Sequence, residues 1–485
     1  MNPDYAGLVH VLQPEIQLVI GALLVLTLDA VWAKHRPANR HHVALTLGLI
    51  ALASAGYQSV VVGRIGPVYG GTFLFDSLTT ATRVGVIGLA ALALALLPAR
   101  LRHPAEFTAI VLFATVGFTL MAAANQLLVV FLALELASLS LYVLAGFDQT
   151  RPGSAEAGLK YYLVGGMSAA FILFGFSLLY GLTGSLYLGQ IARELSMQGL
   201  SPLLLTALAM VLVAFGFKAA AAPFHLWAPD VYEGAPAPAA ALIASASKLA
   251  GLVLFTRLLW SGASPATGTI AHVPVTAGWT PVVALMALAS LLIGNVGALA
   301  QSNVRRLLAY SAIAHAGALL LGVIAAGRTG IGPLFYYAAT YGLATVGAFG
   351  VISALETAGP VQKLTDLAGL HRRSPLLAGC LAIFVLSLAG IPPLAGFFGK
   401  FVVFASVLRL GGLGGPVGWL VILAIALSAV ALYYYLQILK QALVAAPEKG
   451  AAPVKVMPAT AVALAVAAAL LVVLGVAPSL ILQWF

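Results

Sequence analysis

Six titratable residues stand inside long apolar runs, where ionisable side chains are rare. A charge at the bilayer centre costs about 2.5–3.5 kcal/mol even on lenient insertion scales, so such residues usually mark ion or proton pathways. Buried glutamate and lysine can switch between neutral and charged forms as their neighbours change, and histidine titrates close to neutral pH. These residue types favour proton transfer. The candidates are Glu135, Lys218, Lys248, Lys400, His225 and His315.

Each of these residues, taken alone, could have a purely structural role instead of a role in proton transfer. One buried glutamate–lysine pair can be a structural ion pair, and a lone histidine can be a hydrogen-bonded core residue. Four charged groups and two histidines together favour a pathway. By contrast, His41 and His42 lie in a basic loop and are expected to be solvated. Asp29 and Lys34 are expected to form a local pair at the surface or at a subunit contact.

A pair between Glu135 and Lys218 would work as a proton switch. While the pair holds, the lysine keeps its proton, and when Glu135 is drawn elsewhere, Lys218 becomes a better donor. The switch would therefore convert a movement of charge into proton release. Lys248 could accept the proton at mid-membrane, and Lys400 could hold it further along the path.

The composition excludes the soluble classes of protein. Of 485 residues, 62% are hydrophobic and 8% are charged, whereas soluble domains carry about 25% charged residues. A soluble enzyme, a disordered protein and a nucleic-acid binder are therefore excluded. The single Cys380 excludes a disulfide framework, a thiolate metal site and an iron–sulfur cluster. The sequence also lacks a haem-attachment CxxCH motif and a dinucleotide-binding GxGxxG motif.

Apolar runs of about 20 residues, the length that crosses a bilayer, predict an all-α polytopic membrane protein. About 14 transmembrane helices fit the chain, with short loops and no soluble domain. Smaller amphipathic pieces are expected near 186–198 and 64–78. The predicted spans are 9–32, 42–63, 80–99, 107–123, 125–147, 159–184, 201–232, 239–260, 279–300, 303–325, 331–355, 376–409, 415–440 and 457–480.

Two of these spans, 201–232 and 376–409, are too long for one crossing. Proline removes a backbone donor and clashes with the preceding helical turn. The first span contains Pro223 and Pro229, and the second contains the Pro392-Pro393 pair. We therefore expect helices 7 and 12 to be broken.

The candidate residues repeat along the chain in a way that predicts an inverted repeat. Glu135 precedes Lys218 by 83 residues, and His315 precedes Lys400 by 85. Because the broken helices are five apart, equivalent helices would cross the membrane in opposite directions, as in many transporters. The predicted division is 1–106 for helices 1–3, 107–262 for the first repeat (helices 4–8), 263–445 for the second (helices 9–13) and 446–485 for helix 14.

Loop charges predict the orientation of the chain. Most lysines and arginines outside the spans follow odd-numbered helices. Cytoplasmic loops carry this excess of positive charge, so both termini are expected on the outer, periplasmic side of a bacterial inner membrane.

Four segments resemble one known family. They are LELASLSLYVLAGF, FKAAAAPFHLWAPDVYEGAP, NVRRLLAYSAIAHAG and GIPPLAGFFGKF. They resemble subunit N of bacterial proton-pumping NADH–quinone oxidoreductase (respiratory complex I), in the antiporter-like subunit superfamily. The resemblance covers nearly the whole chain. Lys400 favours subunit N over subunit M, which has a glutamate there, and the chain stops after helix 14, without the long lateral helix of subunit L.

The resemblance implies a fold, a role and a set of partners. It implies fourteen helices with two inverted five-helix repeats, Glu135 and Lys218 as the couple of helices 5 and 7, Lys248 as the central lysine of helix 8, and Lys400 as the residue of helix 12. It implies proton translocation driven by quinone reduction elsewhere. NADH, FMN, iron–sulfur clusters and quinone would belong to other subunits, with no cofactor in this chain. Subunits M, K and J, the lipid bilayer and protons are the expected partners, and no nucleic acid is expected.

Two other functions stay open at this stage. The chain could belong to a multisubunit cation/proton antiporter, or to a related hydrogenase or photosynthetic complex. It could also be a scaffold that braces a membrane arm without transporting protons.

Overall fold

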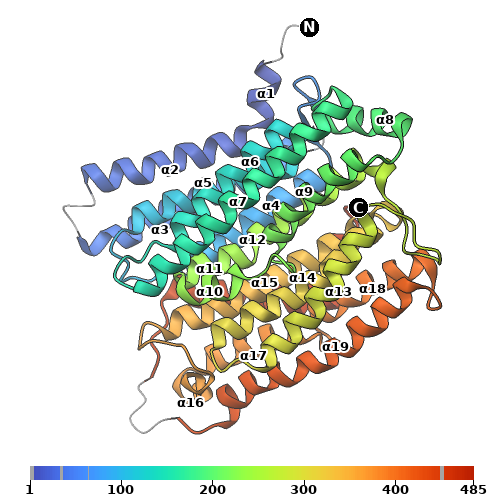
Figure 1. Cartoon of the computed structure of the whole chain (residues 1–485). Coiled ribbons are helices and arrows are strands. Elements are labelled where there is room, and N and C mark those ends of the chain that lie inside the picture. Colours follow the sequence, from blue (N-terminus) through green and yellow to red (C-terminus); the bar gives the residue numbers. More distant parts are fainter. Residues whose placement is uncertain (1–4, 33–36, 64, 448–452) are drawn as a thin grey trace.

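The protein is a bundle of long helices that lie side by side (Figure 1). The computed structural model describes residues 5–32, 37–63, 65–447 and 453–485. Helices of the N-terminal half, blue to green in Figure 1, form one side of the bundle, and those of the C-terminal half, yellow to red, form the other.

The first part of the chain builds one flank of the bundle. Several helices begin with proline in the first turn, where its missing N–H costs nothing. Asp76 caps α4 by accepting a 2.8 Å hydrogen bond from the Thr79 backbone N–H. The elements are α1 (Tyr5–Val11), α2 (Gln13–Val31), α3 (Pro37–Val62), β1 (Gly66–Val68), β2 (Phe73–Phe75), α4 (Ser77–Ala95), α5 (Pro104–Ala123), α6 (Leu127–Ala145), α7 (Pro152–Thr183) and α8 (Leu188–Gln198).

The middle of the chain contains the first break and the most deeply buried helices. Residues 220–226 separate α9 from α10 without regular helix, and α11 and α12 follow end to end. The elements are α9 (Pro202–Ala219), α10 (Trp227–Gly234), α11 (Ala237–Ala244), α12 (Ala246–Arg257), η2 (Leu258–Gly262), η3 (Ser264–Ala266) and α13 (Trp279–Leu299).

The last part of the chain contains the second break and completes the other flank. Residues 390–394 separate α17 from α18. The elements are α14 (Val304–Thr329), α15 (Gly332–Leu355), η4 (Leu364–Leu367), α16 (Leu370–Arg373), α17 (Pro375–Ala389), α18 (Ala395–Gly411), α19 (Pro416–Leu439), η5 (Lys440–Val444), α20 (Pro458–Val476) and α21 (Ser479–Leu482).

The all-α polytopic fold is confirmed. Within the described residues, 13 helices are long and apolar enough to cross a membrane. The remaining expected span, 376–409, is present as two shorter helices, α17 and α18. Both expected breaks are confirmed. Pro223 and the Pro392-Pro393 pair lie inside them, whereas Pro229 lies within α10.

Three local expectations are corrected. Of the expected amphipathic piece at 64–78, residues 65–76 form no helix, because β1 and β2 pair there as an antiparallel hairpin with Gly66 opposite Phe75. The expected helix at 239–260 is interrupted at Ser245, where no proline or glycine warns of it. His41 is buried rather than solvated, although His42 is exposed. The expected Asp29–Lys34 pair is not tested, because Lys34 lies outside the described residues; Asp29 forms an ion pair with Arg40 at 2.5 Å.

The core of the bundle is formed by α11, α12, α14 and α15, which lie in the middle of Figure 1. The apolar windows of Ala237–Gly262 and Gly332–Leu355 are wholly buried, whereas α7 and α19 expose most of theirs. Two of the candidate residues, Lys248 and His315, are carried by these central helices and are thereby kept from lipid.

Candidate functional site

In the first break, residues 220–226, neighbouring residues form hydrogen bonds with backbone groups that lack a helical partner. The Ala220 backbone ends α9 in the left-handed conformation, with φ 55°. The Ala222 N–H donates a 2.8 Å hydrogen bond to Ser290 of α13, and the Trp227 indole donates to the carbonyl of Phe217 at 3.2 Å. Non-helical backbone at membrane depth is tolerated where protein partners replace the lost helical bonds. Hydrogen bonds with the surrounding core therefore stabilise the break.

Lys218 lies in the last turn of α9, directly before this break. Its side chain is buried, and its Nζ donates a 3.3 Å hydrogen bond to the Ser138 hydroxyl of α6. The helix macrodipole favours a cation at this end of a helix. Gly251 of α12 makes room for the lysine stem, since a Cβ at that position would lie 2.8 Å from the Lys218 Cγ.

Glu135 lies one helical turn before Ser138 on α6. Its Oε1 is buried and has no hydrogen-bond partner. Glu135 and Lys218 interact electrostatically. Among the described residues, however, no Glu135–Lys218 contact falls within the 4.0 Å limit for an ion pair. In this conformation the two groups are therefore not in direct contact, and the Ser138 hydroxyl is the hydrogen-bond partner of Lys218.

Lys248 has the weakest charge compensation of the three lysines. It lies in the first turn of α12, just after the interruption at Ser245, where the helix dipole disfavours a cation. Its Nζ donates a 2.8 Å hydrogen bond to the Ala312 carbonyl of α14 and lies 5.0 Å from the centre of the Tyr341 ring. Within the described part of the chain it forms no ion pair.

His315 lies one turn beyond Ala312 on α14 and is held at both ring nitrogens. Its Nδ1 lies 2.6 Å from the Tyr337 hydroxyl, and its Nε2 lies 3.0 Å from the Tyr435 hydroxyl. The Tyr435 hydroxyl also bonds Ser311. The Tyr341 ring centre lies 4.9 Å from that of the histidine. Tyr341 therefore contacts both His315 and Lys248.

Lys400 lies on α18, after the second break, and points back across it. Its Nζ donates hydrogen bonds to the last two carbonyls of α17, those of Leu388 at 3.1 Å and Ala389 at 3.0 Å. These carbonyls lack helical partners, so the ammonium caps the negative end of the helix dipole. The Gly396 backbone N–H donates to the Ser387 hydroxyl at 3.1 Å, which joins the two helices again.

Four of the six candidates form a series through the core. Lys218 packs against α12, the helix that carries Lys248, and Lys248 reaches α14 beside His315. Both Lys248 and Lys400 act electrostatically on His315. His225 does not join this series. It lies in the first break with its Nδ1 buried and without a hydrogen-bond partner, and it forms no hydrogen bond with the other candidates among the described residues.

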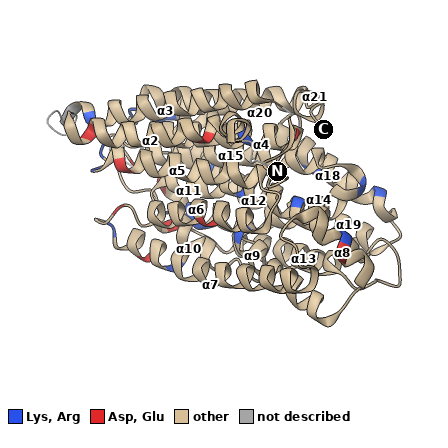
Figure 2. Ribbon diagram, turned by 90° about the horizontal axis from the view of Figure 1, so that it is seen from above, with Lys and Arg blue, Asp and Glu red and all other residues tan. Residues whose placement is uncertain are grey.

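A cluster of charged residues anchors α10 outside the apolar core. Asp230 accepts hydrogen bonds from Lys160 of α7 at 2.6 Å and from Arg306 of α14 at 2.7 Å. Arg306 also bonds Glu233 at 2.9 Å. Figure 2 shows that the ribbon positions of charged residues lie mostly near helix ends, with few along the helices themselves. The cluster fixes α10, and with it one end of the first break, against α7 and α14.

Sequence reasoning missed several residues of this site. Ser138 could have been found, because residues three apart share one helix face and Ser138 is three residues after Glu135. Tyr337 and Tyr341 are four residues apart on α15 and share a face in the same way. Tyr435 carried no such signal, since only tertiary packing brings α19 to His315. Among the residues that the structure describes, no cluster of histidine, cysteine and acidic residues could hold a metal ion.

Sequence comparison adds an independent observation. The family described as NADH:quinone oxidoreductase/Mrp antiporter, transmembrane, matches residues 124–432. A protein of Acidobacterium capsulatum, NADH-quinone oxidoreductase subunit N 2, is 45% identical, and the alignment covers 100% of both chains. NADH-quinone oxidoreductase subunit N 1 of Solibacter usitatus is 37% identical over 97% of this chain and 95% of its own.

Solved structures share the fold. A chain of respiratory complex I from Thermus thermophilus with bound aureothin superposes with a TM-score of 0.80 at 34% identity, covering 97% of this chain and 98% of that one. A chain of the Mrp complex from Dietzia sp. has the same TM-score at 20% identity, covering 97% and 95%. At that lower identity the similarity supports the fold alone.

Proposed function

Because the chain belongs to the NADH:quinone oxidoreductase/Mrp antiporter transmembrane family, we propose that it translocates protons as a membrane-arm subunit of an NADH–quinone oxidoreductase. The observation that carries the proposal is the series of titratable groups formed by the buried Lys218, Lys248 and His315 and the partly buried Lys400. Such groups are costly within a membrane and are retained where ions or protons pass. The full-length similarity to relatives named as subunit N supports the assignment to that complex.

The proposed path runs through the centre of the bundle. Lys218 releases a proton toward Lys248, which passes it to His315, and Lys400 stores it at the second break. Tyr341 lies against both Lys248 and His315, and the hydroxyls of Tyr337 and Tyr435 flank the imidazole. Histidine suits this intermediate position because it exchanges protons near neutral pH. Water would complete the steps between side chains that are not in contact.

Glu135 and Ser138 are the proposed control element at the entry. When Lys218 bonds the Ser138 hydroxyl, as here, its charge lacks a carboxylate in contact. A movement of about one helical turn along α6 would bring the ammonium to Glu135 and stabilise its charge. The two arrangements give Lys218 different tendencies to release its proton. Quinone reduction in other subunits would supply the energy that shifts the balance.

The proposal also covers the domain division, the orientation in the membrane, the neighbouring subunits and the cofactors. The division into 1–106, 107–262, 263–445 and 446–485 is proposed as helices 1–3, two inverted repeats and helix 14. In the inner membrane, both termini would face the periplasm, which is supported by the basic loops after odd-numbered spans. The neighbours would be antiporter-like subunit M and small subunits such as K and J. NADH, FMN, iron–sulfur clusters and quinone would be bound by other subunits.

The Lys248→Met substitution tests this function. Methionine fills the volume of the lysine stem but cannot carry a proton. We expect the complex to assemble and proton pumping to fall about tenfold or more, since a positioned acid–base group contributes roughly 10²–10⁴-fold to proton transfer. Vesicles that contain the purified complex, a pH-sensitive dye, NADH and quinone give the measurement. Native gels verify assembly. Pumping at the wild-type rate would overturn the proposal.

A further inference from the structure

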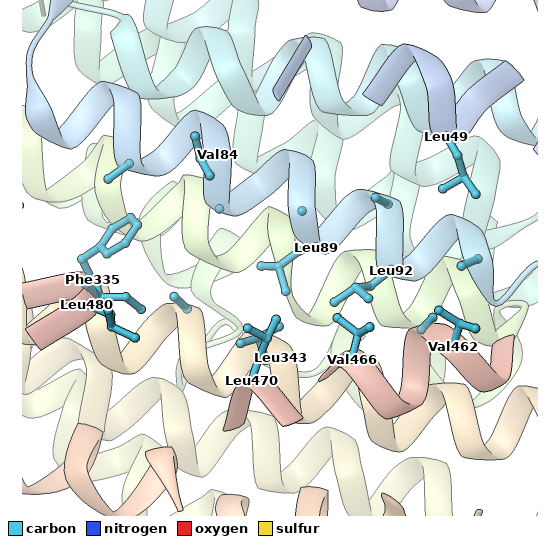
Figure 3. A pocket seen from close by; sticks show the side chains of 18 of the residues that line it. Leu49, Val84, Leu89, Leu92, Phe335, Leu343, Val462, Val466, Leu470 and Leu480 are labelled. Atoms are coloured by element: carbon cyan, nitrogen blue, oxygen red, sulfur yellow. The ribbon is translucent and has the colours of Figure 1, made fainter. Parts of the chain in front are cut away.

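A long apolar groove opens on the outside of the bundle between α4 and α20. Its volume is about 790 Å³, and α15 forms its floor (Figure 3). Leu89 and Leu92 of α4 face Val462 and Val466 of α20, with Leu343 of α15 near the centre. Leu49 of α3 lies toward one end of the groove, and α21 closes the other.

The lining of this groove is almost entirely apolar. All of its residues are apolar, glycine or proline, apart from Trp484, whose ring belongs to the α21 end. Val462 and Val466 on its rim are exposed. An apolar cavity does not hold water, and a space of this size at membrane depth must be filled by apolar groups. On α4 the lining runs from Ala81 to Ala95, about 21 Å of helix and thus most of a membrane core of about 30 Å.

One end of the groove lies beside exposed positive charges. The Thr460 hydroxyl donates a 2.9 Å hydrogen bond to the Ala95 carbonyl, which ties the start of α20 to the end of α4. Pro98 and Met457 line a second, small cavity at this junction. Arg100 follows Pro98 by two residues, and Lys455 precedes Met457 by two. Both are exposed, and neither forms an ion pair among the described residues.

The opposite end has the character of a membrane–water interface. Trp484 lines the groove there, and the Phe485 ring packs 5.0 Å from that of Phe335. Tryptophan is enriched where the hydrocarbon core meets the headgroups. The groove therefore runs from a cationic end to an aromatic end across the apolar layer.

We propose that this groove holds an acyl chain of an anionic phospholipid whose headgroup lies beside Arg100 and Lys455. The apolar slot matches the chain, and the two exposed cations match a phosphate, since polybasic sites attract anionic lipids. A transmembrane helix of another subunit could also fill an apolar slot. It would give these cations no role, so the charges favour the lipid.

Photolabelling of the purified complex in nanodiscs tests the site. The probes are phosphatidylglycerol and phosphatidylcholine with the same photoreactive diazirine acyl chain. We expect the anionic probe to label peptides 81–95 and 458–470 several-fold more than the zwitterionic probe. The Arg100→Gln/Lys455→Gln double variant should lose this preference. The Arg193→Gln/Arg328→Gln double variant, which changes exposed arginines elsewhere, should keep it.

A second variant is designed to block binding of the lipid acyl chain rather than binding of the headgroup. A Cβ at Gly88 would meet nothing within 4 Å, so Gly88→Leu should fill the groove without a clash. It should reduce labelling of both peptides several-fold. Gly166→Leu, on an equally open helix position of α7, should not. If Gly88→Leu prevents assembly, the comparison of the two probes on the unaltered complex still tests whether the groove prefers an anionic lipid.

Three results would overturn the proposal. They are equal labelling by the two probes, labelling that Gly88→Leu leaves unchanged, and cross-linking of a Val462→Cys variant to another subunit. The last result would show that a partner helix occupies the groove. None of these results depends on proton pumping, so the lipid site and the proposed function can fail separately.

Discussion

The two broken helices place their lysines on opposite sides of the break. Lys218 precedes its break and contacts a side chain on another helix, the Ser138 hydroxyl of α6. Lys400 follows its break and contacts two backbone carbonyls of α17, the helix across the break. Glu135 interacts electrostatically with Lys218, whereas no acidic residue contacts Lys400 among the described residues.

This difference indicates two ways to hold an ammonium group inside the bundle. Side-chain partners on a separate helix can be exchanged by a small sliding movement, which suits a switch. Carbonyls at a helix end are fixed in the backbone, and together with the dipole they compensate the charge without any acid. We infer that the first break changes state during the cycle, while the second offers a constant position. Four predictions can break or sharpen this contrast.

The largest effect is expected at the first break. Lys218→Ala and Glu135→Ala each remove half of the switch, so proton pumping should fall about tenfold or more while assembly is largely kept. Without one of the two partners, the paired state of the switch cannot form. Quinone reductase assays and native gels on membrane vesicles provide the measurements. Normal coupled activity in both variants would remove the switch from the mechanism.

A graded effect is expected at the second break. Lys400→Ala should abolish most pumping, whereas Lys400→Arg should retain a part of it, because a guanidinium can still donate to the Leu388 and Ala389 carbonyls. The same vesicle assay gives both values. Equal losses in the two variants would mean that the proton of Lys400, rather than its fixed charge, is the essential feature.

A moderate effect is expected from Gly251→Ala. The added Cβ would lie 2.8 Å from the Lys218 Cγ, so the lysine stem must move. Overpacking of this kind costs about 1–3 kcal/mol. Pumping should fall several-fold, and the complex should melt at a lower temperature. Gly88→Ala, at an open position, is the matched control. If pumping is unchanged, the position of Lys218 matters less than its presence.

The smallest effect is expected from Ser138→Ala. It removes one hydrogen bond to Lys218, a change of about 0.5–1.5 kcal/mol, and should shift the lysine toward Glu135. Pumping should change by a few-fold at most. The counterpart Ser387→Ala removes a backbone contact at the second break and should affect thermal stability more than pumping. The reverse pattern would contradict the contrast between the two breaks.

The spans and both breaks could be predicted because their causes are local. Hydropathy sets a crossing helix, and proline can interrupt it, as Pro223 and the Pro392-Pro393 pair do. The interruption at Ser245 could not be predicted, since no residue there forbids a helix and only packing in the core explains it. The β1–β2 hairpin has a local cause in the Gly-Gly pair at its turn. Tyr69, Gly70 and Gly71 all adopt positive φ at its turn, a pattern typical of Gly-Gly sequences.

The candidate site was predictable in its residues but not in its contacts. Charge inside an apolar run identified Lys218, Lys248 and Lys400 without any structure. Their partners are backbone carbonyls, a hydroxyl and an aromatic face, which carry no distinctive sequence pattern. Sequence shows which residues carry opposite charges but not which atoms are in contact in one conformation, so it did not predict the Ser138 hydroxyl as the partner of Lys218.

The charged cluster around α10 makes α14 a mechanical link between distant parts of the molecule. Arg306 clamps the start of α14 to Asp230 and Glu233, and His315 lies nine residues further along the same rigid helix, about 14 Å away. An axial shift of α14 would therefore displace the edge of the first break and the imidazole at the same instant. Through this helix, a movement in one half of the bundle would be transmitted to the other half.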